Sequence, residues 1–80
     1  MKKEEKELVK EALRIYEYME NGFNRINGAS VRITNLRSVG NKYYYTGTLI
    51  YSEEGQKSIY HDCYMDKKFI QEFIEENKIK

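Results

Sequence analysis

The sequence predicts an α+β fold in which two helices pack on one face of a three-stranded antiparallel sheet and leave the other face open. Apolar residues recur at helical spacing near both ends of the chain. The centre is rich in β-branched and aromatic residues and is divided by short glycine-containing turns. Eighty residues suffice for one modest core, so we expect a single domain over residues 1–80.

Residues 3–21 are expected to form the first helix. Apolar side chains recur there every three or four residues, as in a helix with one buried face. They are Leu8, Ala12, Ile15, Tyr16, Met19 and Phe23, and Val9 and Leu13 widen the stripe. Asn21-Gly22 is a natural end, because glycine readily adopts the left-handed conformation that closes a helix. We expect the opposite face, with its charges and Tyr18, to be solvated.

Three strands are expected next, over about residues 30–38, 42–52 and 56–65. Gly40-Asn41 separates the first two strands, and Glu53-Glu54-Gly55 separates the last two. Connections this short join antiparallel neighbours, so the strands should form a meander.

A final helix is expected over about residues 67–78, with Asp66 as its cap. Its apolar stripe consists of Phe69, Ile70, Phe73 and Ile74. The order of elements is therefore α-β-β-β-α.

Six of the eight tyrosines lie between residues 41 and 65, and the turns predict which way they point. Residues 52–56 fit a three-residue hairpin loop with Gly55 in the left-handed position. That loop pairs Leu49 with Ile59, Tyr45 with Cys63 and Tyr43 with Met65. Because these positions and Tyr51 form the more apolar face, we expect that face to meet the helices.

Val31 and Ile33 join the same face if the loop of residues 40–42 also has an odd count. Gly47, which lies inside a strand, is expected to mark a bulge or a close approach of a helix.

The other face should be open, because two helices can cover only one side of the sheet. It is expected to show Tyr44, Tyr60 and Tyr64 together with Ile50, Leu36 and Arg32. Tyrosine is common at protein interfaces, and apolar residues beside the rings would form a patch that a lone monomer usually avoids. We therefore expect this face to bind another protein, although such residues also suit an ordinary half-exposed sheet.

Charge favours a protein partner over nucleic acid, since 14 basic and 13 acidic residues leave a net charge of only +1. Nucleic acid is the alternative partner, because bases stack on exposed tyrosines of an open sheet. Its contacts would come from the rings and from four basic residues, Arg32, Arg37, Lys67 and Lys68.

The α-β-β-β-α order resembles that of the double-stranded-RNA-binding domain, and Lys67-Lys68 opens the second helix in a similar position. The resemblance implies binding to double-stranded RNA. It is one of topology, because the sequence lacks that family's dense basic cluster and the segment FIQEFIEENK lacks its alanine-rich packing.

His61-Asp62-Cys63 is the one stretch that suggests catalysis. On a strand, His61 and Cys63 would be about 7 Å apart, whereas a nucleophile and its base need about 3 Å. One His and one Cys cannot fill a tetrahedral metal site. We expect no enzymatic activity, no metal, no cofactor and no small-molecule substrate.

The expected function is that of a non-enzymatic inhibitor or adaptor. The small, lysine-rich chain is similar in size and style to proteins with which phages and mobile elements block host defence, such as anti-CRISPR proteins. Two copies could also pair their sheet faces as a homodimer. The single cysteine and the lack of a membrane-length apolar run favour a cytoplasmic location.

Overall fold

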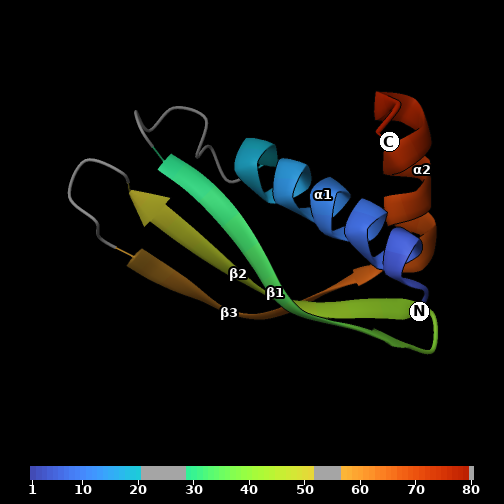
Figure 1. The fold of residues 1–80 in the computed structure, drawn as a ribbon, viewed down its shortest axis with the longest axis horizontal. Helices are drawn as coiled ribbons and strands as arrows, with labels where there is room; N and C mark the ends of the chain where they lie inside the picture. Colours follow the sequence, from blue (N-terminus) through green and yellow to red (C-terminus); the bar gives the residue numbers. More distant parts are fainter. Residues whose placement is uncertain (21–28, 52–56, 80) are drawn as a thin grey trace.

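The structure, a computed structural model, describes residues 1–20, 29–51 and 57–79. Helix α1 spans Lys3–Glu20, strands β1, β2 and β3 span Ala29–Val39, Lys42–Tyr51 and Lys57–Asp66, and helix α2 spans Lys67–Asn77. The antiparallel sheet has the order β1-β2-β3, which confirms the predicted fold class. Figure 1 shows both helices on one side of the curved sheet, and no described segment covers the other side.

No helix in the described part of the chain is both long and apolar enough to cross a membrane.

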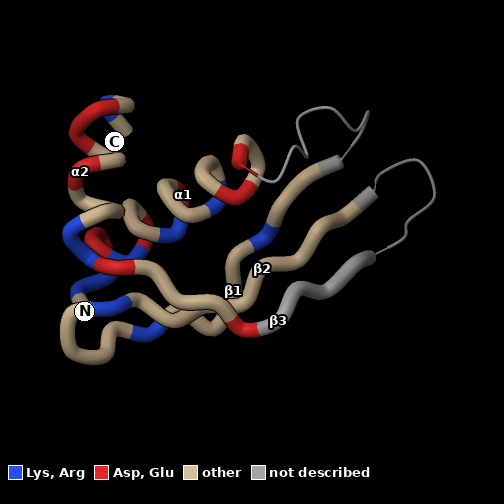
Figure 2. The backbone as a smooth tube through the Cα atoms, turned by 180° about the vertical axis from the view of Figure 1, so that it is seen from behind, with Lys and Arg blue, Asp and Glu red and all other residues tan. Residues whose placement is uncertain are grey.

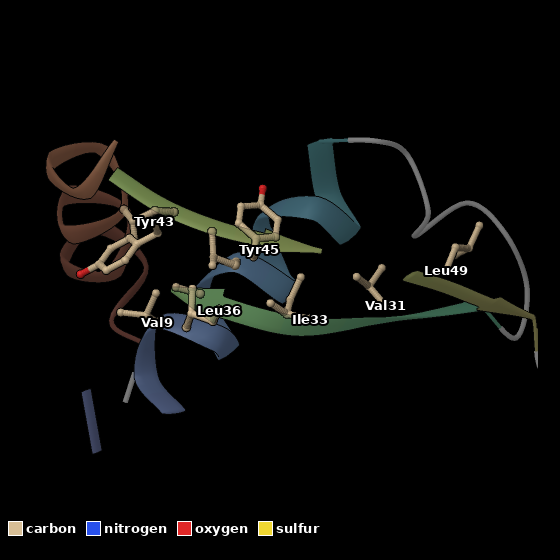
Figure 3. Close-up of a cluster of buried hydrophobic side chains, with 10 residues drawn as sticks. Val9, Val31, Ile33, Leu36, Tyr43, Tyr45 and Leu49 are labelled. Carbon is tan, nitrogen blue, oxygen red and sulfur yellow. The ribbon is translucent and has the colours of Figure 1, made fainter. Parts of the chain in front are cut away.

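The core lies between the helices and the odd-numbered side chains of β2. Tyr43, Tyr45 and Leu49 are each at most 3% exposed. Val31 and Ile33 join them from β1, as Figure 3 shows. The predicted inward direction of these residues is therefore confirmed, while the side chain of Tyr51 is outside the described residues.

The buried stripe of α1 is rotated from the predicted one. Val9, Ala12 and Leu13 are buried with the charged Glu17, whereas Met19 is 54% exposed. The predictions that Met19 is buried and that Tyr18 lies on a solvated face are wrong, since Tyr18 packs against the core.

Glu17 is buried because the sheet gives its carboxylate a donor. The hydroxyl of Tyr45 donates a hydrogen bond to Glu17 Oε1 at 2.9 Å. Such a bond offsets much of the cost of removing a polar group from water. Apolar periodicity in the sequence cannot reveal this partner, which comes from another element.

The connection between β1 and β2 has an even number of residues, whereas the predicted direction of Val31 and Ile33 required an odd number. Val39 pairs with Lys42 across the two residues Gly40 and Asn41. Gly40 has a φ of 58°, a conformation that glycine adopts without strain. A two-residue turn places even-numbered β1 residues opposite odd-numbered β2 residues, which by itself would turn Val31 away from the core.

One extra residue in β1 corrects this mismatch. The register shifts between Thr34 and Arg37, so that two β1 residues, Asn35 and Leu36, lie opposite one β2 residue. Asn35 takes the left-handed conformation with a φ of 56°, which asparagine tolerates better than most residues. Leu36 consequently belongs to the core and is 6% exposed, so its predicted place on the open face is wrong.

A second register shift lies at Gly47. Tyr43 pairs with Met65 and Tyr45 with Cys63, as predicted. Beyond Gly47 the predicted pairing of Leu49 with Ile59 is wrong, because Ile59 pairs with Thr48. The extra residue is in β3, and the predicted bulge at Gly47 is thereby confirmed. The loop predicted over residues 52–56 lies outside the described residues.

Helix α2 begins after Asp66, but the side chain of Asp66 makes no capping hydrogen bond. Its Oδ1 atom instead accepts a hydrogen bond from Lys42 Nζ at 2.8 Å. The backbone N–H of Lys67 donates to the carbonyl of Asn41 at 2.9 Å and so fixes the start of α2 to the β1–β2 turn.

Replacing Tyr45 by phenylalanine should destabilise the protein by about 1–3 kcal/mol, because the buried Glu17 carboxylate loses a donor. Burial, assisted by the Glu17 charge, raises the pKa of Tyr45, so the hydroxyl stays protonated and able to donate. Urea denaturation measures the loss. The matched variant Tyr44→Phe, on the other face of β2, should change stability by less than about 0.5 kcal/mol. Equal stability of the two variants would contradict the role assigned to the Tyr45–Glu17 bond.

Candidate functional site

Three side chains form a row across the open face. Tyr44 of β2 is paired with Arg37 of β1 and with Tyr64 of β3. The ring centroids of Tyr44 and Tyr64 are 5.9 Å apart, with an interplanar angle of 39°. Arg37 Cζ lies 5.9 Å from the centroid of the Tyr44 ring, a distance at which a cation is attracted to an aromatic face.

Lys42, two residues before Tyr44 on β2, brings a second cation to the row. Its Nζ atom lies 4.8 Å from the centroid of the Tyr64 ring and 2.8 Å from the Asp66 carboxylate. The hydrogen bond to Asp66 raises the pKa of Lys42, so this amine remains charged. We call Arg37, Tyr44, Tyr64 and Lys42 the ring row. The pairing of Lys42 with Asp66 across the strands is the signal that could have added Lys42 to the predicted site.

Polar side chains fix the surface next to the ring row. Thr46 Oγ1 donates a hydrogen bond to Asp62 Oδ1 at 2.5 Å. Asn35 Nδ2, at the β1 bulge, donates to Thr46 Oγ1 at 3.4 Å. These contacts connect all three strands and leave the aromatic rings as the largest features of this part of the face.

The structure brings together only part of the predicted binding set. Tyr44 and Tyr64 are in contact, and Tyr64 is 61% exposed. Arg32 is exposed and pairs with Thr48, so it lies about 13 Å along the sheet from the row of Tyr44. Ile50 is half-buried and lies on β2, two residues beyond Thr48 and still further from Tyr44. Tyr60 belongs to β3, but its side chain is outside the described residues.

The basic residues predicted for nucleic acid do not gather on one face. Arg32 and Arg37 are exposed on the open face. Lys67 lies on the helix side, with Nζ 5.4 Å from the ring of the buried Tyr43. Lys68 is exposed on α2. Figure 2 accordingly shows separate blue segments rather than one basic strip along the described strands.

Catalytic and metal-binding chemistry gains no support from the described residues. Cys63 is half-buried, and burial, followed by the charges of Glu17 and Asp62, raises the pKa of its thiol. A reactive cysteine needs the opposite shift. Among the residues that the structure describes, no group of three or more His, Cys, Asp or Glu side chains is arranged to hold a metal ion.

Comparison of the chain with protein-family models, with curated proteins and with solved structures found no match.

Iodoacetamide should alkylate Cys63 slowly at about pH 8, because a raised pKa leaves little of the nucleophilic thiolate. The rate should keep increasing as the pH passes the ordinary thiol pKa of about 8.5. The same chain unfolded in guanidinium chloride provides the reference rate. A native rate at pH 8 that equals or exceeds the unfolded rate would contradict this environment for Cys63.

Proposed function

We propose that this protein is a non-enzymatic binding module that recognises another protein through its open sheet face, with the ring row at the centre of the contact. The observation that carries the proposal is the exposed Tyr64 ring, which lies against Tyr44 on a face that no described segment covers. A cation lies over each of the two rings, Arg37 over Tyr44 and Lys42 over Tyr64.

The ring row is suited to binding because its side chains are already ordered. Tyr44 and Tyr64 are held by strand pairing and by each other, so a partner orders few additional torsions. Tyrosine and arginine are the residue types that most often dominate protein interfaces. Val39, paired with Lys42 at the edge of the row and 55% exposed, adds apolar area.

A protein partner is favoured over nucleic acid by the charges around the rings. Phosphate binding depends on clustered Lys and Arg side chains. Here Asp62 and Asp66 share the face with the ring row, and Lys67 lies on the other side of the sheet. A protein surface offers mixed charges and apolar area, which match this composition.

The contact would act by covering the partner's working surface, as an inhibitor or an adaptor does. A cytoplasmic location agrees with a chain whose single cysteine, Cys63, forms no disulfide, because reducing compartments keep thiols reduced. The size and composition of the chain support a role like that of the small inhibitors with which phages and mobile elements block host defence.

Replacing Tyr44, Tyr60 and Tyr64 together by alanine should weaken binding at least about 30-fold, because interface hot spots contribute about 2 kcal/mol or more. The partner is first captured on wild-type protein, and affinities are then compared by biolayer interferometry. Lys6→Ala, on the exposed face of α1, is the control and should bind like wild type. Circular dichroism verifies that each variant is folded. Unchanged affinity in the folded triple variant would move the site away from the ring row.

The nucleic-acid alternative predicts a different result. Fluorescence anisotropy with labelled single- and double-stranded DNA and RNA, at about 50 mM and 200 mM salt, should show no saturable binding if the partner is a protein. Saturable binding that weakens steeply with salt would favour nucleic acid instead.

A further inference from the structure

A cleft of about 300 Å³ lies between α1 and α2, on the side of the sheet opposite the ring row. Its apolar lining comes from Leu8 and Val9 of α1, Tyr43 of β2 and Ile74 of α2. Val9 and Tyr43 are 2% exposed, and Leu8 and Ile74 are half-buried. The volume is at the small end of the range for ligand sites, so the cleft suits a ligand of few heavy atoms.

The side chains that line the floor of the cleft are uncharged. Burial, and then the charge of Glu5, raises the pKa of the Tyr43 hydroxyl, while its hydrogen bond with the Gln71 side chain acts in the opposite direction. The net shift is upward, so the hydroxyl stays neutral. An apolar group placed on this floor would meet aliphatic side chains and the neutral Tyr43 ring, whose centroid lies 5.4 Å from Lys67 Nζ.

The rim of the cleft carries two carboxylates, those of Glu5 and Glu75. The ion pairs among the described residues are Arg14–Glu11 and Lys42–Asp66, and neither includes Glu5 or Glu75. Glu5 lies in the first turn of α1, where the helix dipole favours a negative charge. Glu75 lies near the end of α2, where the dipole disfavours one, so helix stability does not explain its charge.

We propose that this cleft binds an alkylammonium group, with its aliphatic stem on Leu8, Val9 and Tyr43 and its charged head between Glu5 and Glu75. The negative rim selects a cation, and the apolar floor selects one with a hydrocarbon stem. A free amine and a lysine side chain of another protein share this chemistry. The sequence predicted no small-molecule substrate, so this site departs from that expectation. It does not depend on the ring row.

The test is an NMR titration that follows the methyl groups of Leu8, Val9 and Ile74. Three probes share a six-carbon stem and differ in charge: hexylammonium, hexanol and hexanoate. Hexylammonium should give saturable shifts with a Kd on the order of 1 mM, as expected for so small a ligand. Hexanol should bind at least about fivefold more weakly, and hexanoate should cause no saturable shift at these methyl groups.

A second arm distinguishes the two sources of the cation. N-acetyl-lysine amide presents the same ammonium group on the stem of a lysine side chain. Tighter binding of this probe assigns the cleft to a protein partner, and tighter binding of hexylammonium assigns it to a free amine. Both results support the proposal. Failure of both cations to bind would overturn it.

Two double variants test whether the cation is bound by the two carboxylates at the rim or only attracted by the overall negative charge of the helices. Glu5→Gln with Glu75→Gln should weaken hexylammonium at least about fivefold and leave hexanol unchanged. The control, Glu4→Gln with Glu76→Gln, removes the same charge from the same two helices outside the cleft and should bind hexylammonium like wild type. An equal loss in the control, or equal binding of all three probes, would overturn the proposal. The variant in which Tyr44, Tyr60 and Tyr64 are replaced by alanine should bind hexylammonium like wild type. Failure of the cleft proposal can therefore be told apart from failure of the proposed contact at the sheet face.

Discussion

The strict alternation of side chains along β2 is the constraint on which the rest of the structure depends. β2 is the central strand, so both neighbours must match its division into a buried odd face and an exposed even face. β1 does so with one extra residue between Thr34 and Arg37, and the extra residue in β3, between Ile59 and Asp62, shifts the pairing so that Ile59 lies opposite the even-numbered Thr48. The bulge in β1 keeps Val31 in the core although the adjoining turn has an even count.

The same alternation explains why tyrosines fill this strand. Tyr43 and Tyr45 point inward, and their hydroxyls form hydrogen bonds with the two helices. Tyr45 bonds to Glu17 of α1, and Tyr43 bonds to Gln71 of α2. Phenylalanine would fill the space but would leave those polar groups with fewer partners. The outward Tyr44 instead packs against Tyr64, with an angle of 39° between the rings, and extends an aromatic surface. One run of neighbouring tyrosines therefore serves the core on one side and the candidate binding face on the other.

The fold class, the order of the elements and the inward direction of Tyr43 and Tyr45 could be predicted because they follow from local periodicity and turn chemistry. The burial of Leu36 could not, because it depends on a single extra residue in β1 that the hydrophobic pattern does not mark. The burial of Glu17 depends on the hydroxyl of Tyr45, a partner distant in the sequence. In the candidate site, strand alternation predicted Tyr44 and Tyr64, whereas Lys42 was not predicted, although the predicted register of β2 and β3 places it opposite Asp66.

The division of the tyrosines is tested most directly by photochemically induced dynamic nuclear polarisation with a flavin dye, which detects tyrosine rings that the dye can reach. The structure predicts polarised signals from Tyr64 and Tyr44 and none from Tyr43 and Tyr45. Strong signals from Tyr43 or Tyr45 with a silent Tyr64 would mean that β2 presents its other face, and would contradict both the core and the candidate binding face.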